Sequence, residues 1–99
     1  MTKLVALYKT PPDKELFDKK YFEEHLPLAG KMPGLVRTEV TKLKSLGADE
    51  KYYLQAEMYF DDMDSLNAAM GSPEGKAAAS NLMSFAKELV VMMIGEIEE

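Results

Sequence analysis

The chain has 99 residues, enough for one domain spanning 1–99, and its 46% hydrophobic and 29% charged residues are typical of a globular protein. It has no cysteine and one histidine, which excludes disulfides, thiolate nucleophiles and metal sites made of several cysteines or histidines of one chain. The net charge is −5 with scattered basic residues, and no apolar stretch approaches the ~20 residues of a membrane span, so we expect a cytoplasmic protein that binds neither nucleic acid nor membrane.

The first third of the chain predicts a strand followed by a helix. Residues 4–8 form a short apolar run that stops at a Thr-Pro-Pro sequence, and its lack of alternation indicates a strand buried on both faces. Asp13 is a candidate N-cap for a helix that extends to about residue 32. Pro27 interrupts the helical pattern and should kink this helix or end its first segment near His25.

The middle of the chain predicts a hairpin. Residues 35–43 read as a second strand, residues 44–51 as a loop, and residues 52–60 as a third strand with clear alternation. One face of the third strand carries Leu54, Ala56, Met58 and Phe60, and the other carries Tyr53, Gln55, Glu57 and Tyr59.

The last third predicts helices and a final strand. A second helix starts after the acidic pair 61–62 and is interrupted at 71–75. Ser72, which a proline follows, is a good N-cap for the next helix. Residues 90–97 supply a last apolar strand.

The order strand, helix, strand, strand, helix, strand predicts an α+β protein with the ferredoxin-like βαββαβ arrangement. In it, a four-stranded antiparallel sheet carries the helices on one face. The other face is then bare, although the first and last strands are apolar on both sides. Because an exposed apolar face of that size is typical of a partner-binding surface, we expect a homodimer that packs sheet to sheet.

His25 is the obvious group able to exchange protons near neutral pH, because an unperturbed imidazole titrates at about 6.5. At about 100° per residue it lies about 80° from Phe17, between two apolar clusters of the first helix. The ring should therefore face the core or a pocket. A core imidazole held by one backbone hydrogen bond and a proton-transfer group both fit, and burial should keep the ring mostly neutral in either case.

The aromatic and polar face of the strand 52–60 is the expected lining for a small organic ligand between the two sheets. Glu57 is the sharper candidate on this face. If it is enclosed, its pKa should rise and it could act as a general acid or base, whereas a pair with Arg37 would be structural. A solvated face or a polar dimer interface is the alternative. The candidate ligand-binding residues are Tyr53, Gln55, Tyr59, Arg37 and Tyr21.

Two further groups of residues have structural explanations. Glu23 and Glu24 precede His25, but adjacent helical residues do not face each other, so both are expected to be surface charges. The eight methionines are expected to be adaptable core packing rather than a metal or oxidation site.

Several segments, taken in order, form a recognisable pattern: residues 4–9 (LVALYK), Phe17, 21–29 (YFEEHLPLA), 32–35 (MPGL), 53–60 (YLQAEMYF) and 72–79 (SPEGKAAA). Over nearly the whole chain they resemble the EthD family. The resemblance implies the dimeric α+β barrel superfamily, whose two sheets pack together as the bare face requires. The His25-Leu26-Pro27 segment corresponds to the family's His-x-Pro motif, and in related cyclases such a histidine transfers protons.

The resemblance implies less about activity. The family is named from proteins linked to ethyl tert-butyl ether breakdown, and related barrels include muconolactone isomerases, polyketide cyclases and cofactor-free oxygenases. The first hypothesis is therefore an enzyme without cofactor or metal that acts on a small aromatic or lactone-like molecule, with His25 and Glu57 as catalytic residues. The alternatives are a non-catalytic carrier of a small hydrophobic metabolite, and a purely structural dimer with His25 in the core.

Overall fold

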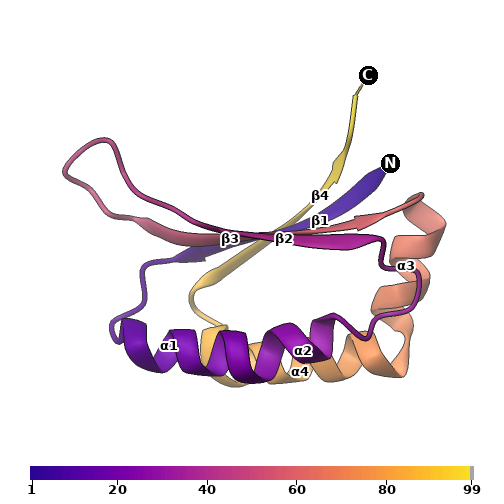
Figure 1. Cartoon of the computed structure of the whole chain (residues 1–99), viewed down its shortest axis with the longest axis horizontal. Helices are drawn as coiled ribbons and strands as arrows, with labels where there is room; N and C mark the ends of the chain where they lie inside the picture. Colours follow the sequence, from indigo (N-terminus) through magenta and orange to yellow (C-terminus); the bar gives the residue numbers. More distant parts are fainter. Residues whose placement is uncertain (99) are drawn as a thin grey trace.

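The computed structural model describes residues 1–98 and has two layers, an antiparallel sheet and helices that cover one of its faces (Figure 1). The strands are β1 (Thr2–Lys9), β2 (Arg37–Lys42), β3 (Tyr52–Phe60) and β4 (Val90–Glu96), in the spatial order β2-β3-β1-β4. The helices are α1 (Lys14–Lys20), the π-helical turn η1 (Tyr21–His25), α2 (Leu26–Ala29), α3 (Met63–Gly71) and α4 (Pro73–Ala86).

The predicted ferredoxin-like arrangement is confirmed. β1 pairs with β3 and β4, and β3 pairs with β2, all antiparallel, with every helix on one side of the sheet (Figure 1). None of the helices within residues 1–98 is long and apolar enough to cross a membrane.

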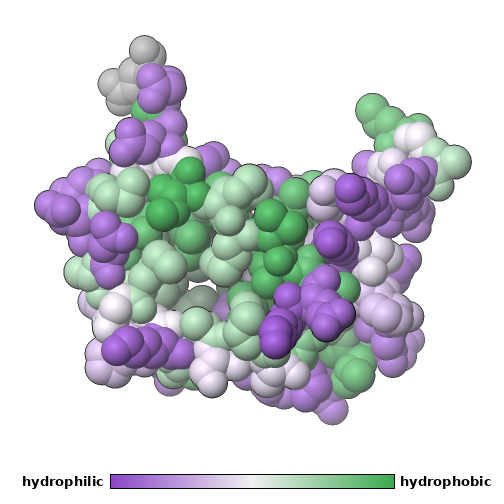
Figure 2. Space-filling model, turned by 180° about the vertical axis from the view of Figure 1, so that it is seen from behind, coloured by the Kyte–Doolittle hydropathy of each residue, from purple (hydrophilic) through white to green (hydrophobic). Residues whose placement is uncertain are grey.

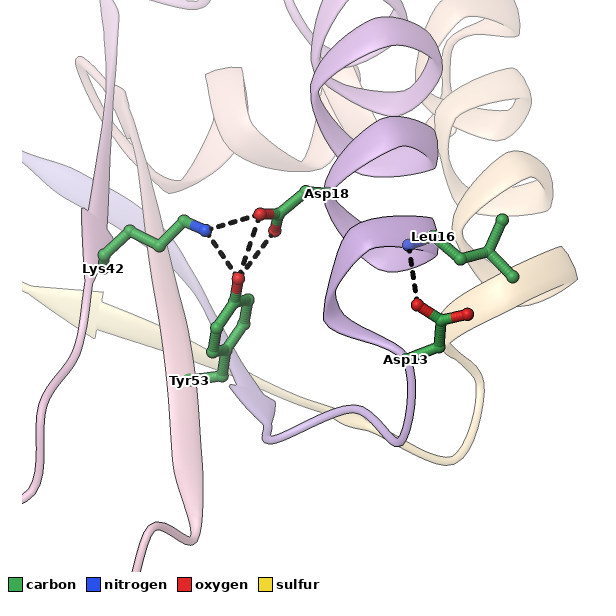
Figure 3. Close-up of polar contacts among 5 residues, drawn as sticks. All are labelled: Asp13, Leu16, Asp18, Lys42 and Tyr53. Atoms are coloured by element: carbon green, nitrogen blue, oxygen red, sulfur yellow. Dashed lines mark hydrogen bonds and ion pairs between the residues drawn. The ribbon is translucent and has the colours of Figure 1, made fainter.

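The helices start where the sequence predicts, because short polar side chains satisfy their first backbone N–H groups. The carboxylate of Asp13 accepts a hydrogen bond from the backbone N–H of Leu16 at 3.1 Å (Figure 3). Asp62 caps α3 at 2.8 Å, and Ser72 caps α4 at 3.0 Å. The predicted interruption at 71–75 is therefore a change of helix at Ser72.

The helical segment continues past Pro27, and the irregularity predicted near His25 is the π-helical turn η1, which ends at His25 where α2 begins. The backbone N–H of Leu26 donates to the carbonyl of Tyr21, five residues earlier, so the turn before the proline is wider than an α-helical turn. A proline ring crowds the carbonyl four residues before it, and the widened turn directly ahead of Pro27 accommodates that ring. His25 is the last residue of this turn.

The core lies between the sheet and the helices and has two parts. One is built around Phe60 and Leu66, which are fully buried. The other is aromatic: the rings of Tyr8, Phe17 and Tyr21 lie with centroids 5.3–5.7 Å apart. The alternation predicted for β3 is confirmed on this side, since Leu54, Ala56, Met58 and Phe60 are all buried.

The edge strand β4 leaves an unusual amount of apolar surface uncovered. Four consecutive residues, Val91, Met92, Met93 and Ile94, are each 39–48% exposed. Pairing with β1 places Met92 on the helix side of the sheet, opposite Ala6, and Met93 on the bare side, opposite Val5. The strand therefore presents apolar side chains to both faces, which is typical of an interface.

Candidate functional site

A cavity of about 100 Å³ lies between the helix-facing side of the sheet and the helices. Strands β1, β3 and β4 form its floor, and η1, α2, α3 and α4 form its walls. Apart from His25 and Tyr8, the lining is aliphatic or thioether, and no charged side chain belongs to it. The lining residues are Leu4, Ala6, Tyr8, His25, Ala29, Met32, Met58, Met70, Gly75, Ala78, Ala79, Leu82, Met83 and Met92.

Methionines surround the mouth of this cavity. Met70, Met83 and Met92 line it and are each 42–43% exposed, so they stand between the cavity and solvent. Figure 2 shows hydrophobic side chains gathered on this side of the molecule around a hollow in the surface. Methionine is unbranched and flexible, so the mouth can widen without disturbing the backbone.

His25 is the last residue of η1 and is 5% exposed. Its ring lies 5.5 Å from that of Tyr21 and 6.3 Å from that of Phe85. A π-helical turn holds more residues than an α-helical turn, so His25, four residues after Tyr21, lies over it on the buried side. The predicted burial of His25 is confirmed.

Burial lowers the pKa of His25, because the charged imidazolium loses hydration in an apolar environment. The side chain of Asn81 and the backbone carbonyl of Ala78, both on α4, act in the opposite direction. A pKa below its ordinary value of about 6.5 leaves the imidazole mostly neutral at pH 7, as predicted. A neutral imidazole has one ring nitrogen that can accept a proton and one N–H group that can donate a proton.

Tyr21 lies behind His25 rather than at the cavity surface. It is 1% exposed, and burial raises the pKa of its hydroxyl to about 12, with a smaller opposing effect from the hydroxyl of Tyr8. Tyr8 lines the cavity, and burial raises its pKa as well. Both phenols stay protonated at neutral pH, so Tyr21 supports the histidine ring and Tyr8 presents an apolar ring face.

Gln55, Glu57, Tyr59 and Arg37 lie on the opposite, bare face of the sheet, as their alternation predicts. The guanidinium of Arg37 lies 4.1 Å from the ring centre of Tyr59, its partner across the β2–β3 ladder. Arg37 also pairs with Glu39 at 3.1 Å. These residues are therefore separated from His25 by the thickness of the sheet.

The environment of Glu57 differs from the two alternatives considered for it. Its carboxylate pairs with Nζ of Lys3 at 2.6 Å, and not with Arg37. The hydrogen bond from Lys3 holds the pKa of Glu57 below its usual value and outweighs the effect of burial. A raised pKa was the condition for acid or base chemistry at neutral pH, and this condition is not met.

The predicted orientation of Tyr53 is wrong. Tyr8 of β1 pairs with Leu54, whereas the next residue, Lys9, pairs with Tyr52, so Tyr53 is an extra residue in β3. Such a β-bulge turns two consecutive side chains to the same side. The ring of Tyr53 consequently packs against Phe17 of α1, with ring centres 5.8 Å apart, and not on the bare face.

Of the seven candidate residues, His25 alone lines the cavity. The methionines form much of the lining, although the sequence pattern assigns them only to core packing. Asn81 was missed altogether. It follows Ala78 by three residues and precedes Phe85 by four, so it lies within the inward-facing stripe of α4, and a polar residue in such a stripe is the signal that could have found it.

Comparison with known proteins agrees with this architecture. Residues 9–86 match the family model described as the EthD domain, and the chain belongs to this family. An EthD (ethyl tert-butyl ether D) family protein from Bacillus halodurans C-125, solved as a crystal structure, is 47% identical. Each chain covers 99% of the other, with a TM-score of 0.96.

Two other comparisons are informative. An uncharacterised 11.0 kDa protein of the thcB–thcC intergenic region of Rhodococcus erythropolis is 32% identical, over 99% of this chain and 96% of that one. SnoaB from Streptomyces nogalater, a cofactor-independent oxygenase, is 14% identical with a TM-score of 0.71, over 99% of this chain and 93% of its own. Further solved structures that share the fold, 15–22% identical, are described as dimeric.

Proposed function

We propose that this protein binds a small, uncharged organic molecule in the cavity beside His25, and that His25 transfers a proton to or from that molecule without a cofactor. The observation that carries the proposal is the position of His25. Within the described lining, it is the one side chain whose ordinary pKa is near neutral, and it lies in an otherwise apolar cavity with a flexible mouth.

The size of the cavity limits the ligand to about one ring. An engineered protein cavity of about 150 Å³ binds benzene, and the cavity here has about 100 Å³. A single aromatic or lactone ring therefore fits once the side chains of Met70, Met83 or Met92 move outward. Methionine sulfur also makes favourable contacts with aromatic rings, which supports an aromatic ligand.

The absence of charge in the described lining limits the ligand further. An ionised carboxylate or phosphate would lose its hydration in the cavity and find no cationic side chain among the lining residues. A neutral phenol, ketone or lactone loses less hydration free energy than an ion on entering the cavity, because it carries no net charge.

The fold of SnoaB supports chemistry without a cofactor on this scaffold, by analogy of fold. A second candidate function is a carrier that binds the same ligand without turnover. It is favoured by the isolation of His25, since Glu57 lies across the sheet and is ion-paired with Lys3. The proposal assigns Glu57 to that ion pair and not to catalysis.

The proposal includes a homodimer in which the bare faces of two sheets pack together. Val5 and Leu7 of β1 and Val91 and Met93 of β4 form an apolar half of this face. The pair of Lys3 and Glu57 belongs to its polar half. Burying the apolar half against a second copy removes it from water, and dimeric proteins of the same fold support this arrangement.

Binding can be tested with the methionine methyl groups, labelled with ¹³C and observed by NMR. On addition of phenol, toluene or a five-membered lactone, the methyl signals of the five cavity methionines should shift. Met93 is the matched control, because it neighbours Met92 in β4 but lies on the bare face. If Met93 shifts and Met92 does not, the ligand binds between the sheets and the proposed site is overturned. The cavity methionines are Met32, Met58, Met70, Met83 and Met92.

Catalysis can be tested by following the exchange of solvent deuterium into the carbon next to the carbonyl of a bound lactone. His25→Asn should lower the exchange rate by about 10²–10⁴-fold, the usual contribution of a positioned acid or base. Glu57→Gln should leave the rate unchanged. Methyl shifts without any exchange above buffer would identify a carrier, and the absence of methyl shifts with every ligand would contradict both functions.

A further inference from the structure

We infer that Asn81 is a positioning residue that holds the imidazole of His25 in the tautomer with hydrogen on Nδ1, so that Nε2 is the atom that accepts a proton from a ligand. The inference rests on the proposed function and deepens it. It makes His25 the base in the first step and requires the ligand to be a proton donor.

The first observation is a pair of buried polar atoms. Within residues 1–98, Nδ1 of His25 and Oδ1 of Asn81 are the side-chain atoms that are fully buried without a hydrogen-bond partner. Buried polar atoms are nearly always paired in folded proteins. These two come from elements that pack against each other, η1 and α4. A ring nitrogen that carries hydrogen is the partner that an amide oxygen requires.

The second observation fixes the orientation of the amide. Nδ2 of Asn81 donates to Oε1 of Glu24 at 3.4 Å. An ionised carboxylate can only accept hydrogen bonds, so the NH₂ group of Asn81 must face Glu24 and its oxygen must face away. Glu24 is itself held by Lys20, one turn earlier, at 3.9 Å. The carboxylate next to His25 in the sequence thus reaches the imidazole indirectly, through Asn81.

The third observation concerns what else faces the ring. The side chain of Asn81 and the backbone of Ala78, both on α4, raise the pKa of the imidazole against the effect of burial. Acceptors act in this direction, and they favour hydrogen on the ring nitrogen that faces them. A neutral imidazole has a single N–H, so the other nitrogen, Nε2, is left as an acceptor.

This tautomer defines the chemistry of the ligand. A hydroxyl of a phenol or enol can donate to Nε2, whereas an ether or ester oxygen cannot. In a proton-transfer reaction, an acidic C–H bond of the ligand breaks, its electron pair stays on the ligand as an enolate, and an N–H bond forms at Nε2. Return of that proton to another position of the enolate gives an isomer and restores the neutral ring, so no oxidant or co-reactant is needed.

The tautomer can be read directly from the ¹⁵N chemical shifts of the imidazole in the ligand-free protein at pH 8. We expect Nδ1 in the range of a protonated ring nitrogen and Nε2 in the range of an unprotonated one. Asn81→Leu should shift the population toward hydrogen on Nε2, the form that free imidazole prefers. Asn81→Asp keeps an acceptor and should retain hydrogen on Nδ1. Hydrogen on Nε2 in the wild-type protein overturns the inference even if the variants do not fold.

The role of Glu24 in orienting the amide of Asn81 can be tested with two substitutions that each remove one negative charge. Glu24→Gln removes the acceptor-only group, so the amide of Asn81 can turn over and the tautomers should mix. Glu23→Gln removes the same charge from the exposed neighbouring position and should change nothing. An identical tautomer in wild type, Glu24→Gln and Asn81→Leu would show that Asn81 does not position the ring.

The role of Nε2 as an acceptor can be tested with two ligands of nearly the same shape, phenol and toluene. Phenol should shift the Nε2 signal, and toluene, which lacks the hydroxyl, should shift the cavity methionine methyls but not Nε2. If both ligands shift the methyl signals and neither shifts the Nε2 signal, the ligands bind in the cavity but Nε2 does not act as the base. If neither ligand moves the methyls, the proposed function fails, and the ligand-free tautomer alone then decides the positioning role of Asn81.

Discussion

The hydroxyl of Tyr53 lies 2.9 Å from Oδ1 and 3.0 Å from Oδ2 of Asp18, where it donates a hydrogen bond to the carboxylate (Figure 3). Nζ of Lys42 donates to the same hydroxyl at 2.6 Å and pairs with Asp18 at 2.8 Å. This cluster joins β2 and β3 to α1 and exists because the bulge in β3 turns Tyr53 to the helix side. The side chain of Tyr53 thus connects the sheet to α1, and it is not a ligand-binding residue of the bare face.

Tyr53→Phe should therefore reduce stability without affecting the ligand or the dimer. It keeps the ring on Phe17 but removes the hydroxyl, so the free energy of unfolding should fall by about 1 kcal/mol. For a domain of this size, that corresponds to a loss of roughly 4–8 °C in Tm. Tyr52→Phe is the control, because Tyr52 lies at the strand end and is 36% exposed. Equal effects of the two substitutions in thermal unfolding would contradict this role.

His25 should make stability depend on pH in a defined range. Its pKa is lowered in the folded protein relative to 6.5, so the unfolded chain takes up the proton first as pH falls below 6.5. The free energy of unfolding should then decrease with falling pH, by at most about 1.4 kcal/mol per pH unit. The effect fades within about one pH unit above 6.5, where the imidazole becomes neutral in both states.

The measurement is urea unfolding of wild type and His25→Asn between pH 5.5 and 8, a range above the usual carboxylate pKa values. The wild-type curve should fall toward pH 5.5, while the curve of the variant stays flat. Parallel curves would mean that burial does not depress the pKa of His25. Glu57 does not interfere, because its pKa is lowered from 4.5 and its contribution is lost only at more acidic pH.

Gly75 should not tolerate even a methyl group. A Cβ at this position would lie 2.1 Å from the carbonyl oxygen of Ala69, in a place where the first turn of α4 approaches α3. Gly75→Ala should therefore push the two helices apart and cost about 2 kcal/mol or more of stability, in the range of overpacked cores. Gly71→Ala is the matched control, because nothing lies within 4 Å of its Cβ position, and it should be neutral or slightly stabilising. Equal melting temperatures for the two variants would show that α3 and α4 adapt without cost.

The proposed dimer predicts a difference between two exposed apolar residues. Met93 is 44% exposed on the bare face of the sheet, and Leu16 is 50% exposed on α1. Met93→Asp places a charge in the proposed interface and should reduce the mass measured by light scattering from about twice 11.1 kDa to that of the monomer. Leu16→Asp should leave the dimer intact. A dimer that survives Met93→Asp at micromolar concentration would place the interface elsewhere.

The fold was predictable because its signals are local. The alternation of residues 52–60 identifies the buried set Leu54, Ala56, Met58 and Phe60, and the caps Asp13 and Ser72 mark helix starts. Tyr53 departs from the alternation because its orientation depends on how β3 pairs with β1, and a bulge leaves no mark in the sequence of one strand. Glu57 was placed on the correct face, but its partner, Lys3, is 54 residues away in the chain.

The sequence by itself determined the order of strands and helices, the helix-covered face of the sheet and the burial of His25, because periodicity of 2 or 3.6 residues assigns each side chain to a face. Only the tertiary structure decided that the cavity lies on the helix side of the sheet and that His25 lines it, with Asn81 of α4 next to the imidazole. A cavity is the space left by side chains of seven different elements, and the place of His25 in it depends on how η1 packs against α4. Neither effect follows from the residues of one segment, because both depend on how the layers pack.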